Sequence, residues 1–341
     1  MGDSTTPKPP EPPPPQARVG LTPPWAGPLW EAFSPQLPLA VALSGGADST
    51  ALLLACHQRW PGQVQALHIN HGLQAAAAEF EAHGQHLCEQ LGVPLWCERL
   101  TLDVAKGESV EQVARVARYQ ALAQLARQHG LAAGCIALAQ HADDQVETVL
   151  LALLRGAGLP GLAAMPAHFE RHGVRFVRPW LHVSASSLRD WLRAIGQPWV
   201  EDPSNDNLQL TRNRIRHALS PALQAHFPAH RQTLARTARH AAQAQALLQE
   251  LGEQDLQRCG TPPRIQDLQA LSPPRLVNAL RVWLKSLGLR VSSAQIDELV
   301  AQVQDCTTSG HRIELKVGEG HVVRQADVLV GYNLPLSRGH S

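Results

Sequence analysis

Two periods of apolar residues alternate along the first half of the chain. Strand-like segments occur at 39–43, 64–70, 94–100 and 134–139, and the first of them is a continuous apolar run. Segments with apolar residues at helical spacing follow them at 48–59, 75–91, 109–129 and 144–155. Parallel strands need long crossover connections, which helices usually supply. The alternation therefore predicts an α/β fold with a doubly wound parallel sheet.

The pattern changes after Gly161. A bridging segment extends to about residue 220 and contains one clear helix, at 184–195. The spacing then predicts a long helix over 221–253, interrupted once, and two or three further helices over 264–304. Short alternating runs that indicate strands follow at 311–317, 321–324 and 328–331.

These patterns divide the chain into three parts. Residues 1–24 are rich in proline and predict a disordered tail, because such a segment cannot bury enough apolar surface to fold. Residues 25–219 carry the alternating strands and helices and form the predicted catalytic domain. Residues 220–335 form a predicted smaller, mainly helical domain with short C-terminal strands.

Composition supports a globular protein but does not reveal its partner. The 341 residues are 44% hydrophobic and 17% charged, and the formal net charge is +1. A net charge close to zero does not by itself indicate nucleic-acid binding, so a prediction of such binding must depend on local clusters of positive charge. No run of 18 apolar residues indicates a membrane span. The six cysteines contain no Cys-x-x-Cys pair, which is typical of buried thiols in a reducing cytoplasm.

A glycine turn between the first strand and the first helix indicates a phosphate site. Ser44, Gly45 and Gly46 follow the strand directly, so backbone N–H groups and a helix N-terminus can face an anion. The lysine of a Walker A loop is missing. Asp48 stands nearby instead, and a carboxylate beside phosphates implies an intervening Mg²⁺. An ordinary strand-to-helix turn that contains two glycines is the alternative.

The complete string is more specific than its glycines. It resembles the PP-loop of the N-type ATP pyrophosphatases, which cleave ATP between the α and β phosphates. The resemblance implies an ATP-binding set that consists of Ser44, Gly45, Gly46, Ala47, Asp48 and Ser49.

A second acidic group follows the strand at 134–139. Asp144 and Glu147 are three residues apart, so both lie on one face of the predicted helix. Two such carboxylates can bind Mg²⁺ or accept a proton from an amine. Asp143 is better explained as the N-cap of this helix.

Several motifs in a fixed order identify a narrower family. They occupy residues 43–49, 68–73, 141–148, 153–158, 202–205 and 211–216. Together they resemble the tRNA(Ile)-lysidine synthetase family over about residues 39–330. Longer members of that family carry a further C-terminal domain, and we expect no complete counterpart here.

The resemblance implies a ligase that forms a carbon–nitrogen bond. ATP first adenylates the C2 oxygen of the wobble cytidine in the isoleucine tRNA with the anticodon CAU. The ε-amine of L-lysine then displaces AMP and forms lysidine. Asp48, Asp144 and Glu147 are the implied catalytic residues, and Asp48 and Asp144 the implied Mg²⁺ ligands. By analogy with the family, Asp144 is the favoured base for the amine.

Other motif residues suggest contacts to the substrates. His68 belongs to a loop that we assign to the adenine or ribose side of ATP, although purely structural histidines explain it equally well. Arg118 is favoured over Arg115 as a contact for the lysine carboxylate or the triphosphate. A solvated helix face is the alternative for both arginines.

Local charge supports an RNA substrate. Residues 171–240 contain eleven arginines and four acidic residues, and arginine suits phosphate contacts. Arg212 and Arg214 are expected to contact substrate phosphates or the anticodon nucleotide. Trp180, Trp191 and Trp199 are candidates for stacking on the extruded base, with core packing as the alternative.

Two rival functions share part of this pattern. A tRNA 2-thiolation enzyme would have the same ATP fold, but it typically needs catalytic or cluster-binding cysteines. The cysteines here lack such spacing, and we expect Cys56, Cys88, Cys97 and Cys135 to pack as small core residues. A non-catalytic tRNA-binding protein is disfavoured by the intact acidic residues.

Overall fold

The computed structural model describes residues 22–70, 77–102, 104–105, 110–131, 134–308, 310–318 and 320–333. It contains two compact units, which divide between Ala238 and Arg239. Most of the predicted tail and His71 lie outside the described residues. Within the described residues, no helix combines the length and the apolar character that crossing a membrane requires.

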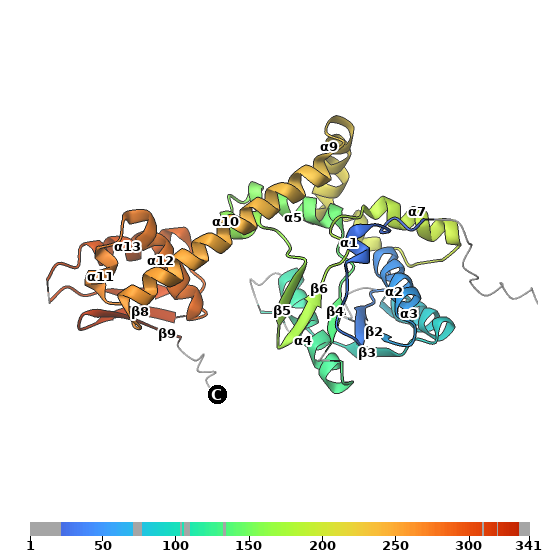
Figure 1. Cartoon of the computed structure of the whole chain (residues 1–341), viewed down its shortest axis with the longest axis horizontal. Helices are drawn as coiled ribbons and strands as arrows, with labels where there is room; N and C mark the ends of the chain where they lie inside the picture. Colours follow the sequence, from blue (N-terminus) through green and yellow to red (C-terminus); the bar gives the residue numbers. More distant parts are fainter. Residues whose placement is uncertain are drawn as a thin grey trace, which may run out of the picture. The chain divides into compact units, whose positions relative to one another are not determined.

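A six-stranded sheet forms the centre of the first unit, and its strands lie in the order β3-β2-β1-β4-β6-β5 (Figure 1). The strands are β1 (Leu39–Ala42), β2 (Val64–Asn70), β3 (Leu95–Arg99), β4 (Cys135–Ala137), β5 (His168–Arg171) and β6 (Val174–Val177). All neighbours pair in parallel except β5 and β6. The α/β fold with a mostly parallel sheet is therefore confirmed.

The hairpin of β5 and β6 was not predicted from the sequence, which assigned this region to a bridging segment. Each strand has only four residues, so the alternating pattern is too short to stand out. The turn between them uses His172 and Gly173, both at positive φ (51° and 71°). Two such residues form the tight turn that matches the twist of a hairpin.

The helices of the first unit are α1 (Pro28–Glu31), α2 (Ala47–Arg59), α3 (Ala77–Leu91), α4 (Val110–Gln128), α5 (Ala142–Leu154), α6 (Leu159–Leu162), α7 (Ala185–Ile195), α8 (Thr211–Arg214) and α9 (Ser220–His226). The short helices α1, α6 and α8 were not predicted from the sequence, whereas the others lie at predicted positions. A short 3₁₀ helix, Pro203–Asp206, precedes α8, and a π-helical turn, Ile215–Leu219, follows it.

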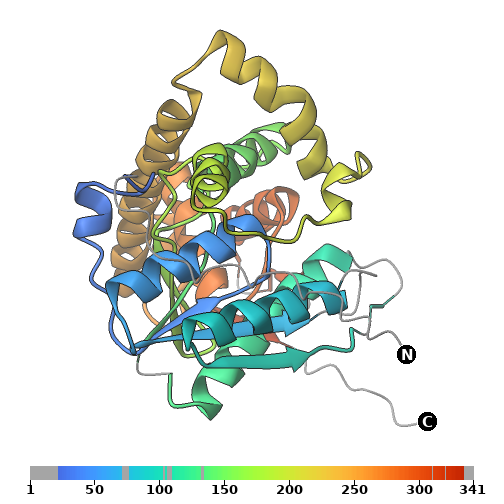
Figure 2. The ribbon, with the colours of Figure 1, turned by 90° about the vertical axis from the view of Figure 1, so that its right-hand side faces the viewer.

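Two hydrophobic clusters lie on opposite faces of the sheet. Leu53 of α2, Leu87 of α3 and Leu188 of α7 pack with Leu39 and Val41 of β1. Leu122 of α4 packs in the other cluster. Figure 2 shows α2 and α3 together in front of the strands. Because successive strand residues point to opposite faces, β1 is buried on both sides, as a central parallel strand should be.

Tryptophans close one side of the first cluster. Trp25 is 3% exposed, and its ring stacks on that of Trp180 with 4.6 Å between centroids. Trp191 meets Trp25 edge to face at the same separation. Core packing therefore explains Trp180 and Trp191. Trp25, the first residue of the predicted catalytic domain, is part of the same core.

The second unit combines helices with a small sheet. Its elements are the last part of α10 (His230–Cys259), α11 (Ile265–Gln269), α12 (Pro273–Ser286), α13 (Ser293–Gln304), β7 (Glu314–Val317), β8 (Gly320–Gln325) and β9 (Val328–Asn333). The three strands form an antiparallel meander. The predicted helices and short strands are thus present. The two units divide within α10, so the predicted domain boundary near residue 220 stays a prediction.

The start of β4 depends on a close backbone approach. A Cβ atom at Gly134 would lie 2.0 Å from the carbonyl oxygen of Pro38. We expect Gly134→Ala to lower the free energy of unfolding by about 2 kcal/mol or more, because the backbone must move to relieve the clash. Urea unfolding followed by tryptophan fluorescence measures this change.

Gly310→Ala is the matched control, because its added methyl group meets no atom within 4 Å. Its free energy of unfolding should change by less than about 0.5 kcal/mol. Equal stabilities of the two variants would contradict the proposed role of Gly134.

Candidate active site

The loop between β1 and α2 has the shape of an anion cradle. Gly45 has φ +87°, and a Cβ atom there would lie 3.0 Å from the ring of Phe80. Ser49 accepts a hydrogen bond from the Ser44 N–H and donates one to the Gly46 carbonyl, both at 3.1 Å. Gly46 is the N-cap of α2 and brings no side-chain cap, so the first N–H groups of α2 face outward from its end.

A cavity of about 480 Å³ opens beside this loop. It collects most of the residues that the sequence singled out, namely Ser44, Gly46, Ala47, Asp48, Ser49, His68, Arg118, Asp144 and Arg212. These residues come from the ends of three strands and from two helices that are distant in sequence. The site predicted at the carboxyl ends of the strands therefore has one common cavity.

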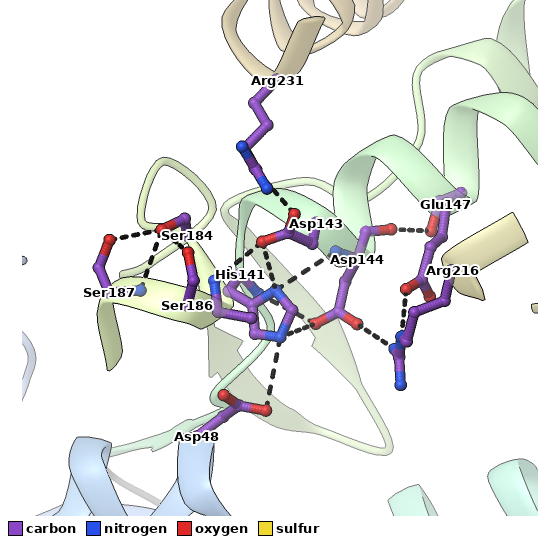
Figure 3. Close-up of polar contacts among 12 residues, drawn as sticks. Asp48, His141, Asp143, Asp144, Glu147, Ser184, Ser186, Ser187, Arg216 and Arg231 are labelled. Carbon is purple, nitrogen blue, oxygen red and sulfur yellow. Dashed lines mark hydrogen bonds and ion pairs between the residues drawn. The ribbon is translucent and has the colours of Figure 1, made fainter. Parts of the chain in front are cut away.

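His141 lies between the two acidic motifs (Figure 3). Its Nε2 is 3.4 Å from Asp48 Oδ2 and 3.5 Å from Asp144 Oδ2, and the residue is 4% exposed. Burial disfavours the charged ring, but Asp144 and Asp48 outweigh it and raise the pKa of His141 to about 9. Burial also opposes the ionisation of Asp48, yet His141 lowers the pKa of that carboxyl below its usual value. A cation at this point thus allows two carboxylates to lie close together.

The N-cap of α5 is His141, so the assignment of this role to Asp143 was wrong. In the neutral ring, His141 Nδ1 accepts a hydrogen bond from the Asp144 N–H at 3.3 Å. The backbone N–H of His141 donates to Asp144 Oδ2 at 3.0 Å in either charge state of the ring. Asp143 instead accepts from the Ala185 N–H at 2.8 Å and from Arg231 Nε at 2.7 Å. It therefore ties the start of α5 to α7 and α10.

Glu147 does not line the cavity. It is 1% exposed, and its Oε1 accepts a hydrogen bond from Arg216 Nε at 2.8 Å. Burial raises the pKa of Glu147, although the charge of Arg216 opposes that shift. Arg216 itself lines the cavity and reaches to 3.8 Å from Asp144 Oδ1. Glu147 therefore lies behind Arg216, outside the cavity, whereas Asp144 lines the cavity.

Arg216 is the last residue of the motif at 211–216, and its pattern alone predicted no role for it. The π-helical turn that contains it sets it beside the loop of the 3₁₀ helix, where its Nη1 donates to Asn205 Oδ1 at 3.4 Å. Asn213 fixes the same loop through bonds to the carbonyls of Ser204 and Asn207, at 2.8 and 3.0 Å. Membership of the 211–216 motif was a signal that Arg216 belongs to the site, but it did not indicate which side chains Arg216 contacts.

Asp48 and Asp144 are the residues that could hold a metal ion. Asp48 Oδ1 is buried and has no hydrogen-bond partner among the described residues. In that part of the chain, no group of three or more His, Cys, Asp or Glu side chains forms a metal site. Mg²⁺ is usually held by one or two carboxylates together with substrate phosphates. The two aspartates beside the anion cradle fit that donor set.

The basic residues divide between the cavity and the surface. Arg212 and Arg118 line the cavity, whereas Arg214 is exposed and donates to Thr211 Oγ1 at 3.0 Å. Arg115 also lines it and lies over the ring of Tyr119. Arg212 and Arg214 were expected to act together, but of the two only Arg212 lines the cavity.

His68 reaches the cavity from the end of β2. Its Nδ1 lies 2.8 Å from the carbonyl oxygen of Leu43, and burial lowers the pKa of its ring. A neutral imidazole in this position anchors β2 to the first residue after β1. His68 can therefore have the structural role of joining β2 to the end of β1 and also contact a nucleotide in the cavity.

The cysteines lie away from this chemistry. In the described residues, none of them lines the cavity, and all six are free thiols. Cys56, Cys88 and Cys135 are buried as expected, but Cys97 is exposed, so its assignment to the core was wrong. Cys97 lies on β3, an edge strand of the sheet, where one side of the strand is uncovered.

The parallel sheet, the glycine loop and the acidic strand end define a PP-loop enzyme of the class that uses ATP. A family model described as the PP-loop domain matches residues 29–223, and another, the TilS substrate binding domain, matches residues 264–330. A protein from Polaromonas naphthalenivorans named tRNA(Ile)-lysidine synthase is 56% identical over 300 residues, which cover 87% of this chain and 90% of that protein. The chain belongs to the tRNA(Ile)-lysidine synthase family.

Further relatives differ in length. One from Bordetella pertussis is 40% identical, with 84% of this chain and 92% of that protein covered. One from Pseudomonas aeruginosa is 46% identical, and the match covers 72% of this chain but only 58% of that longer protein. Among solved structures, a U34-tRNA thiolase from Methanococcus maripaludis has a TM-score of 0.52 at 14% identity, over 62% of this chain and 74% of that one. At that identity the likeness supports the fold alone.

The pair of Arg216 and Glu147 yields a stability prediction. Arg216→Met leaves a carboxylate buried without its partner, whereas Glu147→Gln leaves a neutral amide that still accepts a hydrogen bond. We expect the free energy of unfolding to fall by about 3 kcal/mol for Arg216→Met and by about 1 kcal/mol for Glu147→Gln. Chemical denaturation at neutral pH measures both.

Arg193→Met is the control for Arg216→Met. Arg193 pairs with Asp190 at 2.7 Å, but the side chains are 61% and 70% exposed. Such surface pairs contribute at most about 1 kcal/mol. A similar loss of stability in Arg193→Met and Arg216→Met would show that burial of Glu147 is not the cause.

Proposed function

We propose that this chain ligates L-lysine to C2 of the wobble cytidine in the isoleucine tRNA with a CAU anticodon. ATP would be consumed, and AMP and pyrophosphate released, through an adenylated tRNA intermediate. The observation that carries the proposal is the single cavity onto which the PP-loop, Asp48 and Asp144 all open. Such a reaction needs a phosphate site and a proton acceptor within one enclosure, and it belongs in the cytoplasm with its tRNA substrate.

In the first step the C2 oxygen of the cytidine attacks the α-phosphorus of ATP. The bond between the α-phosphorus and the bridging oxygen breaks, and pyrophosphate leaves with that oxygen. The backbone N–H groups after Gly46 and the N-terminus of α2 would stabilise the departing charge. Mg²⁺ bound by Asp48 and Asp144 would neutralise phosphate charge. His68 would face the adenosine side of the nucleotide.

In the second step the ε-amine of lysine attacks C2 of the activated cytidine. The C2–O bond breaks, AMP leaves with the oxygen, and the amine loses its proton. Asp144 is the favoured acceptor by analogy with the family, and it lines the cavity, whereas Glu147 is covered by Arg216. In this proposal Glu147 contributes to catalysis by holding Arg216.

The tRNA would reach the cavity on its arginine-lined side. Arg212 and Arg216 come from one short segment and both line the cavity, so they suit the phosphates around the extruded nucleotide. Arg214, which is exposed nearby, would contact the tRNA outside the cavity. Arg118 would face the lysine carboxylate or the triphosphate.

The alternative functions receive less support from the site. Sulfur transfer by a thiolation enzyme would typically need a thiol or a cluster near the nucleotide, and no cysteine in the described part of the chain lines the cavity. A protein that only binds tRNA has no need for two carboxylates held together by a buried histidine.

The direct test is a lysine-incorporation assay. We expect labelled lysine to enter the CAU isoleucine tRNA only with ATP, with AMP and pyrophosphate released in equal amounts. The same tRNA with a uridine at the wobble position is the control, because it lacks the amidine system that the cytidine offers. Equal labelling of the control, or none of either tRNA, would refute the proposed function.

The two aspartates yield a second functional prediction. We expect Asp48→Ala and Asp144→Ala each to slow adenylation of the tRNA at least about 100-fold, because each removes a charge that acts on the reacting groups. Release of pyrophosphate without lysine measures this half-reaction.

Asp190→Asn is the control for the aspartate variants, since that carboxylate is 70% exposed on α7. Its adenylation rate should equal that of the wild type. Wild-type rates in Asp48→Ala or Asp144→Ala, with unchanged thermal unfolding, would remove the corresponding aspartate from the mechanism.

A further inference from the structure

A buried arginine without an acidic partner lies behind the cavity. Arg178 follows β6 directly and is 4% exposed. It donates from Nε to Gln140 Oε1 at 2.7 Å, from Nη1 to the Pro166 carbonyl at 2.8 Å and from Nη2 to the Tyr119 hydroxyl at 3.3 Å. All three partners are neutral, and in the described residues no carboxylate lies within ion-pair distance. Buried charges are normally paired, so this cation is unusual.

Among the arginines counted over 171–240, Arg178 therefore does not contribute to a basic surface. Arg175 is exposed, but Arg178 is inside the protein, where it cannot contact the backbone of a tRNA. Inside the protein, its charge acts through the groups that it contacts and through its electric field, which also reaches Asp144.

Two of those groups line the cavity. Tyr119 and Gln140 both do so, and Tyr119 is only 4% exposed. A guanidinium group only donates hydrogen bonds, so it must face the oxygen of Tyr119 and the amide oxygen of Gln140. The Tyr119 O–H and the Gln140 NH₂ group are consequently left to donate elsewhere. A hydroxyl that accepts a bond from a cation also becomes a stronger donor.

Further positive charge surrounds Tyr119. The guanidinium groups of Arg115 and Arg171 lie 5.5 and 4.8 Å from the centre of its ring. Rigid packing holds the ring itself, because Phe169 and Phe176 both meet it edge to face. This side of the cavity thus combines fixed donors with a positive potential, while Asp48 and Asp144 make another part of its wall negative.

We propose that Tyr119 and Gln140 form the subsite for the α-carboxylate of the lysine substrate, with Arg178 as the residue that positions both donors. Of the two roles open to Arg118, this assignment leaves the contact to the triphosphate. The inference rests on the proposed function. Lysine carries a cation and a carboxylate at opposite ends, so the acidic side of the cavity would receive the amine and this side the carboxylate. A phosphate group of ATP is the other anion with suitable chemistry, but the PP-loop already provides its site.

Tyr119→Phe tests the subsite while keeping the ring and its packing. We expect KM for lysine to rise about tenfold or more, since one hydrogen bond to a charged group is lost. The lysine-independent adenylation of tRNA, and KM for ATP, should stay unchanged. The preference for lysine over 1,5-diaminopentane, which has the amine but no carboxylate, should fall by the same factor. Tyr332→Phe, at the second tyrosine of the chain, is the matched control and should leave all these values as in the wild type.

Arg178→Lys tests the positioning role, because a lysine keeps the charge but cannot make the three bonds of the guanidinium fork. We expect KM for lysine to rise at least as much as in Tyr119→Phe, with adenylation retained and thermal unfolding checked. Higher KM for ATP or slower adenylation in Tyr119→Phe would assign the subsite to a phosphate and overturn the proposal. An unchanged KM for lysine in Tyr119→Phe would overturn it as well. If the wild type incorporates no lysine at all, the proposed function itself fails.

Discussion

The parallel pairing of β1 with β4 is the constraint on which the site depends. Leu39 pairs with Cys135 and Val41 with Ala137, so the two strands end side by side. The chain after β1 turns into the glycine loop, and the chain after β4 reaches His141 and the start of α5. Hydrogen bonds of the sheet therefore bring two motifs together that are about a hundred residues apart. Without this register, Asp48 and Asp144 would not meet at one histidine.

Once these strand ends meet, the electrostatics require a cation. Asp48 and Asp144 lie within 3.5 Å of His141 Nε2, and Asp143 within 3.9 Å of its Nδ1. Like charges so close are costly in a partly buried site, and the ionised ring offsets that cost. In the neutral ring, Nδ1 of His141 accepts the hydrogen bond that caps α5. Protonation of Nδ1 removes this hydrogen bond but lets the charged ring pair with the carboxylates. Mg²⁺ bound by the aspartates would supply the same compensation in the working enzyme.

The sequence predicted the framework well because that information is local. Buried strands such as β1, predicted at 39–43 and found at Leu39–Ala42, are continuous apolar runs between turns. The β5–β6 hairpin was not predicted because its strands are too short to show an alternating pattern. The shared helix face of Asp144 and Glu147 was inferred correctly, but their separate roles depend on Arg216, which is 69 residues from Glu147 in sequence. The burial of Arg178 was equally invisible, because spacing along the chain does not show what covers a side chain.

The charges that make the acidic side of the cavity can serve both halves of the proposed reaction. During adenylation they would hold the cation that accompanies the triphosphate. After pyrophosphate has left, they would face the ammonium group of lysine and receive its proton. Carboxylates suit both tasks, because each stage presents positive charge at the same place. When neither substrate is bound, the positive charge of His141 offsets the repulsion between Asp48 and Asp144. The two carboxylates can therefore stay close together in the empty cavity.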